Sequence, residues 1–104
     1  MSPTYHVINP ATESIVTTIE HLDLAGTDAV ISQAAKAFET WRQVSPGDRG
    51  KLLRRFAEVV AAHKEELAQL EIANSGHTRG NALWEFDNGI NVLRTEQRRL
   101  GGAW

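Results

Sequence analysis

The chain has 104 residues, no cysteine and a formal net charge of -2, from 11 Lys plus Arg and 13 Asp plus Glu. A chain of this length forms at most one domain with one modest hydrophobic core, which excludes a large multidomain enzyme unless the chain is part of one. Without cysteine it has no disulfide, no thiolate metal ligand and no thiol nucleophile. The small net charge provides no cationic field, so we expect neither nucleic acid nor a membrane as a partner.

The beginning of the chain shows no targeting signal. No basic flank is followed by an apolar stretch there, and nowhere do the roughly 18 apolar residues of a membrane span run together. We therefore expect a soluble, cytoplasmic protein.

Residues 5–26 predict a β-hairpin. Residues 5–8 and 15–19 are rich in β-branched and aromatic side chains, and residues 9–14 between them carry turn-forming side chains. An isolated hairpin leaves unpaired edges and an uncovered face, so we expect it to be docked on another part of the protein.

Residues 27–100 predict three amphipathic helices. The first has Thr27 as its N-cap and Asp28 in its first turn. The second follows Ser45 as its cap and runs from Pro46 to about Asn74. Its apolar stripe is the longest in the chain: Leu52, Leu53, Phe56, Val59, Val60, His63, Leu67 and Leu70.

The third predicted helix covers approximately residues 79–100 and follows Gly76, which is placed for a left-handed helix end. Gly89 in its interior predicts a kink or a close contact with another helix. Trp41 and Trp84 are expected in the core. The predicted fold class is thus α+β, mostly α, with a short N-terminal β-hairpin followed by three helices in one segment, residues 1–104.

Few residues suggest chemistry. His63 and Glu66, one turn apart, are two ligands of a weak metal site, and an ordinary partly buried histidine is the favoured interpretation. Ser75 and His77 are a nucleophile and base only if a carboxylate and an oxyanion hole accompany them, so a polar loop is favoured. The basic end formed by Arg94, Arg98 and Arg99 suits the helix dipole better than it suits an anion site.

Short stretches in register over residues 5–76 resemble the amino-terminal region of the NAD(P)-dependent aldehyde dehydrogenase superfamily. Residues 9–12, Asn-Pro-Ala-Thr, are similar to that family's opening motif. Residues 34–42 (AAKAFETWR), 45–55 (SPGDRGKLLRR) and 65–71 (EELAQLE) resemble its first helices.

Two departures accompany this resemblance. Glu13-Ser14 stand where the family usually has Gly-Glu, and residues 75–78, Ser-Gly-His-Thr, stand where it often has Thr-Gly-Lys-Pro. Some members bind a structural monovalent cation through a backbone carbonyl before Asn-Pro and an acidic side chain before the Gly-Lys-Pro turn. The matching positions are Ile8 and Asn74, and Asn74 offers a neutral amide.

The resemblance also implies what this chain lacks. Family members are several times longer, with a cofactor domain that binds NAD or NADP and a catalytic domain whose cysteine attacks the aldehyde. We expect both domains to be absent here, with no cofactor site and no catalytic residue in the chain. The chain is then a structural fragment of an enzyme that oxidises an aldehyde to a carboxylic acid.

Two other functions stay open. The chain could be a stand-alone helical module that binds another protein or itself, because an orphaned segment exposes apolar surface. A small enzyme in its own right is the least favoured. The expected partners are accordingly the missing domains or a second copy of the chain.

Overall fold

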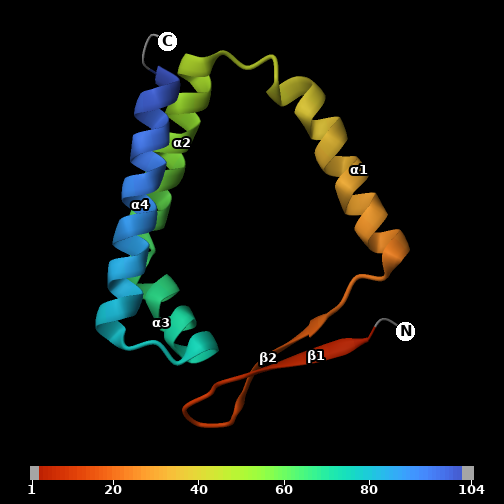
Figure 1. Cartoon of the computed structure of the whole chain (residues 1–104), viewed down its shortest axis with the longest axis vertical. Coiled ribbons are helices and arrows are strands. Elements are labelled where there is room, and N and C mark those ends of the chain that lie inside the picture. Colours follow the sequence, from red (N-terminus) through yellow and green to blue (C-terminus); the bar gives the residue numbers. More distant parts are fainter. Residues whose placement is uncertain (1–2, 102–104) are drawn as a thin grey trace.

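The computed structural model describes residues 3–101, with side chains as far as Arg99. Within these residues a two-stranded antiparallel hairpin is followed by four helices, so the predicted α+β, mostly α class is confirmed (Figure 1). The radius of gyration is 17.8 Å, compared with about 13 Å for a compact domain of this length. The segment is therefore open.

The predicted hairpin is confirmed. Strand β1 (Thr4–Ile8) pairs with β2 (Ile15–Glu20) in antiparallel register. The turn between them is built on Asn9, whose Oδ1 accepts hydrogen bonds from the backbone N–H groups of Ala11 and Thr12 at 2.9 and 3.3 Å. This local bond is the typical turn chemistry of an asparagine.

Helix α1 (Leu24–Trp41) begins earlier than predicted. Its N-cap is Asp23, whose carboxylate accepts a hydrogen bond from the N–H of Gly26 at 2.7 Å. The assignment of Thr27 as the cap was wrong, because its hydroxyl donates to the Asp23 carbonyl from inside the helix. No residue of α1 is buried, and the helix stands apart from α2 and α4 (Figure 1).

The single helix predicted over residues 46–74 is in fact two. Helix α2 (Pro46–Ala62) and helix α3 (Lys64–Ser75) are separated by His63, whose φ of -105° and ψ of 12° are not helical. The predicted cap is confirmed, since the Ser45 hydroxyl accepts from the N–H of Asp48 at 3.1 Å. The apolar stripe continues through His63, so the local sequence pattern gives no sign of the break. The chain changes direction there, and α2 and α3 both pack against a third helix.

Helix α4 (Arg79–Gly101) provides that third surface. It lies along α2 and also contacts α3 (Figure 1). Lys64, at the start of α3, donates to the carboxylate of Asp87 on α4 at 2.7 Å. The buried residues are mostly small, which allows the helix backbones to approach closely. They are Gly50, Ala57, Ala68, Ala82 and Ile90.

Several expected core positions are exposed. Trp41 and Trp84 retain 40% and 66% of their accessible surface, so their assignment to the core of this chain was wrong. Phe56, on the longest predicted apolar stripe, retains 54%. The expectation for Gly89 was also wrong, because α4 continues through it and a Cβ there would meet nothing within 4 Å. Sequence periodicity identifies an apolar face but not whether this chain itself covers it.

We expect Ile90→Ala to lower the free energy of unfolding by about 2–5 kcal/mol, because Ile90 is only 4% exposed and its truncation leaves a cavity between the helices. Val92→Ala on the same helix is the matched control, since Val92 is 54% exposed and should lose less than about 1 kcal/mol. Urea unfolding followed by circular dichroism measures both. Equal losses would contradict the assignment of the α4 core face.

Candidate functional site

The corner between α3 and α4 gathers several polar contacts. Gly76 ends α3 with a φ of 74°, and its N–H donates to the Ile72 carbonyl at 2.9 Å. The left-handed helix end predicted at Gly76 is therefore confirmed. The Thr78 hydroxyl then accepts from the N–H of Asn81 at 3.3 Å at the start of α4.

The hairpin turn docks against this corner. A Cβ built on Gly76 would lie 2.8 Å from Cγ of Pro10, which is closer than real Cβ contacts come. Only glycine therefore satisfies both the positive φ and the approach of the proline ring. The turn of residues 9–14 lies beside the end of α3, at the lower left of Figure 1.

The structure shows how Ile8 and Asn74 are held. Ile8 ends β1, two residues before Pro10, and Asn74 lies two residues before Gly76. The Asn74 amide donates to the Leu70 carbonyl at 2.7 Å, which leaves its Oδ1 as the free acceptor. The two positions offer neutral oxygens, one from the backbone and one from the side-chain amide, so neither supplies a charged ligand.

Glu71, His77 and Glu85 form a cluster at the same corner, in which one ligand atom of each residue lies within 4.8 Å of the others. His77 Nδ1 is 3.8 Å from Glu71 Oε1 and 3.3 Å from Glu85 Oε2. Ser75 donates to the Glu71 carbonyl at 2.7 Å and to its carboxylate at 3.0 Å. Since the Ser75 hydroxyl is turned to Glu71, it does not form the nucleophile and base pair with His77.

An ion pair fixes α3 to α4 on the solvent side. Both guanidinium Nη atoms of Arg79 donate to the carboxylate of Glu65, and the Nη2–Oε2 distance is 3.1 Å. This hydrogen bonding lowers the pKa of Glu65 and raises that of Arg79. Both side chains are more than half exposed, so the pair orients the corner more than it stabilises the fold.

His63 and Glu66 are together but not buried. His63 Nδ1 lies 3.2 Å from Glu66 Oε2, and the two side chains are 59% and 73% exposed. The expected partly buried histidine is therefore wrong, because His63 sits at the break between α2 and α3. Two exposed ligands one turn apart make no metal site by themselves.

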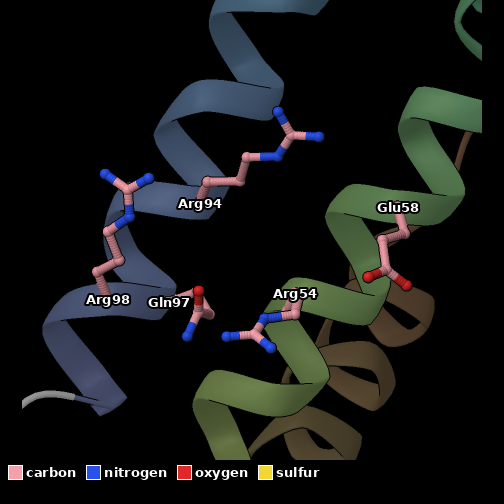
Figure 2. A pocket seen from close by; sticks show the side chains of 5 residues that line it. All are labelled: Arg54, Glu58, Arg94, Gln97 and Arg98. Atoms are coloured by element: carbon pink, nitrogen blue, oxygen red, sulfur yellow. The ribbon is translucent and has the colours of Figure 1, made fainter.

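The basic end of α4 borders a pocket of about 320 Å³ against α2 (Figure 2). Arg54 from α2 joins Arg94 and Arg98, with Glu58 and Gln97 completing the lining. In Figure 2 the Arg98 side chain points away from α2 and that of Arg54 points toward Gln97. Because the guanidinium groups do not converge, the pocket fits a solvated basic helix end better than an anion site.

Sequence reasoning missed the Glu71–His77–Glu85 cluster and the part that Arg54 plays in the pocket. The cluster residues come from α3, from the connecting loop and from the second turn of α4. Their separations of six and eight residues match no familiar ligand spacing. Gly76 was the available signal, because a left-handed helix end predicts a reversal that brings the flanking helices together.

Comparison with known proteins decides the family. The model of the aldehyde dehydrogenase family matches residues 1–100. The chain belongs to the aldehyde dehydrogenase family. It corresponds to an amino-terminal segment of such a protein, as the opening motif and first helices predict.

Curated relatives agree with this aldehyde dehydrogenase assignment. The chain is 34% identical over 103 residues to the putative aldehyde dehydrogenase DhaS of Bacillus subtilis, covering 97% of this chain and 20% of that protein. It is 33% identical over 102 residues to the mitochondrial succinate-semialdehyde dehydrogenase of Arabidopsis thaliana, covering 95% and 19%. The segment therefore spans about a fifth of the length of these relatives.

Solved aldehyde dehydrogenase structures contain the same fold. The NAD-dependent benzaldehyde dehydrogenase of Corynebacterium glutamicum superposes with a TM-score of 0.91 at 27% identity, covering 95% of this chain and 22% of that one. Betaine aldehyde dehydrogenase of Staphylococcus aureus, solved with NAD⁺, also gives 0.91 at 27% identity, covering 96% and 20%. Among residues 3–101 no helix is long and apolar enough to cross a membrane.

We expect Gly76→Ala to destabilise the chain by about 1–2 kcal/mol from the left-handed backbone alone, and to displace the Pro10 ring as well. Gly80→Ala is the control, since a Cβ there meets nothing within 4 Å and alanine favours a helix by up to about 1 kcal/mol. Thermal unfolding measures both. A double variant that also carries Pro10→Ala should recover the steric part only, and unchanged stability of Gly76→Ala would contradict the docking of the turn.

We expect Arg79→Met to raise the pKa of Glu65 toward its ordinary value, because the guanidinium hydrogen bonds favour the carboxylate. A lowered folded-state pKa gives stability that is present above the unfolded-state pKa and is lost as the pH falls through the folded-state pKa. The difference in stability between the parent and Arg79→Met should therefore vanish in acid. NMR titration of the Glu65 carboxyl carbon tests the shift, with Arg94→Met as a control that should leave it unchanged.

Proposed function

We propose that this chain is the amino-terminal structural segment of an NAD- or NADP-dependent aldehyde dehydrogenase. In the complete enzyme the hairpin and helices pack against the cofactor domain, and the chain alone performs no catalysis. The family match and the NAD⁺-bound neighbour support the reaction and the cofactor. The complete enzyme oxidises its aldehyde to a carboxylic acid in the cytoplasm.

One observation carries the proposal, namely the amount of surface that the chain leaves uncovered. Its accessible area is 8061 Å², whereas a compact monomer of this mass exposes about 5,800 Å². The excess lies in the range that permanent interfaces bury. An open segment with this much surface fits a piece of a larger body.

The uncovered surface is rich in large apolar side chains on both strands, on α1 and on the outer face of α2. Each of them keeps at least 40% of its area exposed. They include Tyr5, Ile8, Ile15, Ile19, Val30, Ile31, Phe38, Trp41, Leu52, Phe56 and Val59. Apolar patches of this extent mark protein contact surfaces, so we assign them to the contact with the other domains of the enzyme.

The division of labour within the segment follows. The α2, α3 and α4 unit holds its own small core, whereas α1 and the hairpin have little packing of their own. By resemblance, the backbone carbonyl of Ile8 and the side-chain amide of Asn74 would hold a structural monovalent cation near the docked turn.

A chimaera tests the proposal. In the benzaldehyde dehydrogenase of Corynebacterium glutamicum, this chain replaces the segment that it superposes on. We expect a soluble chimaera that forms NADH from NAD⁺ and benzaldehyde, whereas the isolated chain forms none. Phe38→Asp should abolish the soluble activity of the chimaera without changing the unfolding of the isolated chain, because Phe38 is 58% exposed there.

Lys36→Asp on the same helix is the matched control, because Lys36 is exposed and polar. It should leave the activity of the chimaera unchanged. A Phe38→Asp chimaera as active and as stable as its parent would contradict the proposal. An inactive parent chimaera, together with a stable oligomer of the isolated chain, would favour the stand-alone interaction module.

A further inference from the structure

We propose that Glu71, His77 and Glu85 bind a divalent transition-metal ion, with Zn²⁺ as the best-fitting ion. The site lies at the α3–α4 corner, beside the Gly76 turn. It is independent of the proposed function, because its ligands and its geometry belong to this chain alone.

The donor set is the first argument. One imidazole nitrogen and two carboxylate oxygens are the ligand types that Zn²⁺ accepts in three-ligand protein sites, with water in the fourth position. The two carboxylates carry a charge of -2 that a divalent ion neutralises. The mixture of nitrogen and oxygen disfavours Ca²⁺ and Mg²⁺, which take oxygen ligands.

The geometry is the second argument. Bond lengths of about 2.0–2.2 Å in a tetrahedral site place the ligand atoms about 3.3–3.6 Å apart. The distances from His77 Nδ1 are 3.3 Å to Glu85 Oε2 and 3.8 Å to Glu71 Oε1, and no pair of ligand atoms in the cluster is separated by more than 4.8 Å. Small rotations of the carboxylates close the remaining gap.

The environment of His77 is the third argument. Its Nδ1 is buried from solvent and makes no hydrogen bond within the described residues, although two carboxylates face it. The whole side chain is 37% exposed, so the buried nitrogen belongs to a ring that lies at the surface of the corner. A buried nitrogen lone pair without a hydrogen-bond donor is suited to a metal ion, with the ring proton on Nε2.

The fourth argument concerns support around the ligands. Ser75 donates to the Glu71 carboxylate at 3.0 Å and thereby orients it. Such hydrogen bonds to ligating carboxylates are usual around metal sites. The Gly76 turn and the Glu65–Arg79 pair hold the two helices at the corner, so the three ligands are preassembled.

The alternative is a protonated His77 that forms ion pairs with both carboxylates. His77→Lys distinguishes the metal site from the ion pairs, because lysine retains the positive charge but is a poor zinc ligand at neutral pH. It also restores the residue that the family's Gly-Lys-Pro turn has at this position, so the variant should fold.

The experiment is calorimetric titration of Zn²⁺ into the full 104-residue chain at pH 7.5, with Co²⁺ absorption spectra as a second readout. We expect one site with micromolar or tighter affinity and intense Co²⁺ bands of tetrahedral coordination. His77→Lys and Glu85→Gln should each weaken binding at least tenfold. His63→Ala removes the other histidine–glutamate pair and should leave the affinity unchanged.

Circular dichroism of His77→Lys confirms that the variant folds, so that a loss of binding reports on ligation. Absence of zinc binding to the parent chain would overturn the proposal. Binding that survives His77→Lys, or that is lost in His63→Ala, would overturn it as well.

Discussion

The packing of α2 against α4 is the contact on which the rest of the segment depends. Gly50 and Ala57 on α2 face the neighbouring helix with almost no side-chain volume, and Ala82 and Ile90 are the buried residues of α4. Small residues let the two backbones approach, and close approach gives many weak dispersion contacts at once. Because the core is this thin, larger apolar residues beside it remain exposed.

The α3–α4 corner converts that pair of helices into a three-helix unit. The break at His63 turns α3 out of the line of α2, and Gly76 reverses the chain into α4. Two ion pairs, Lys64 with Asp87 and Glu65 with Arg79, cross from one helix to the other. The same reversal brings Glu71, His77 and Glu85 together and gives the hairpin turn its docking point, so one glycine conformation organises several features.

The rest of the segment is built to be covered. Helix α1 has no buried residue, and both strands of the hairpin expose apolar side chains and an unpaired edge. A two-stranded sheet is marginal alone and needs a surface to pack on. Membership of the aldehyde dehydrogenase family, with a match to about a fifth of its relatives' length, accounts for this incomplete burial.

The sequence by itself determined the hairpin, the Ser45 cap, the left-handed end at Gly76 and the family. Each of these depends on local backbone chemistry or on a short motif, and none of them requires knowledge of distant contacts. The apolar stripes of the helices were also visible, but a stripe does not identify what covers it. Phe56 belongs to such a stripe and is still exposed.

Only the tertiary structure decided the break at His63, the exposure of α1 and the assembly of the Glu71–His77–Glu85 cluster. Each of these depends on where a helix points after a turn, and the direction of a helix is set by packing between elements far apart in the chain. The apolar pattern is continuous across His63, and the cluster residues follow no ligand spacing. Contacts across space selected one arrangement from several that the local pattern allows.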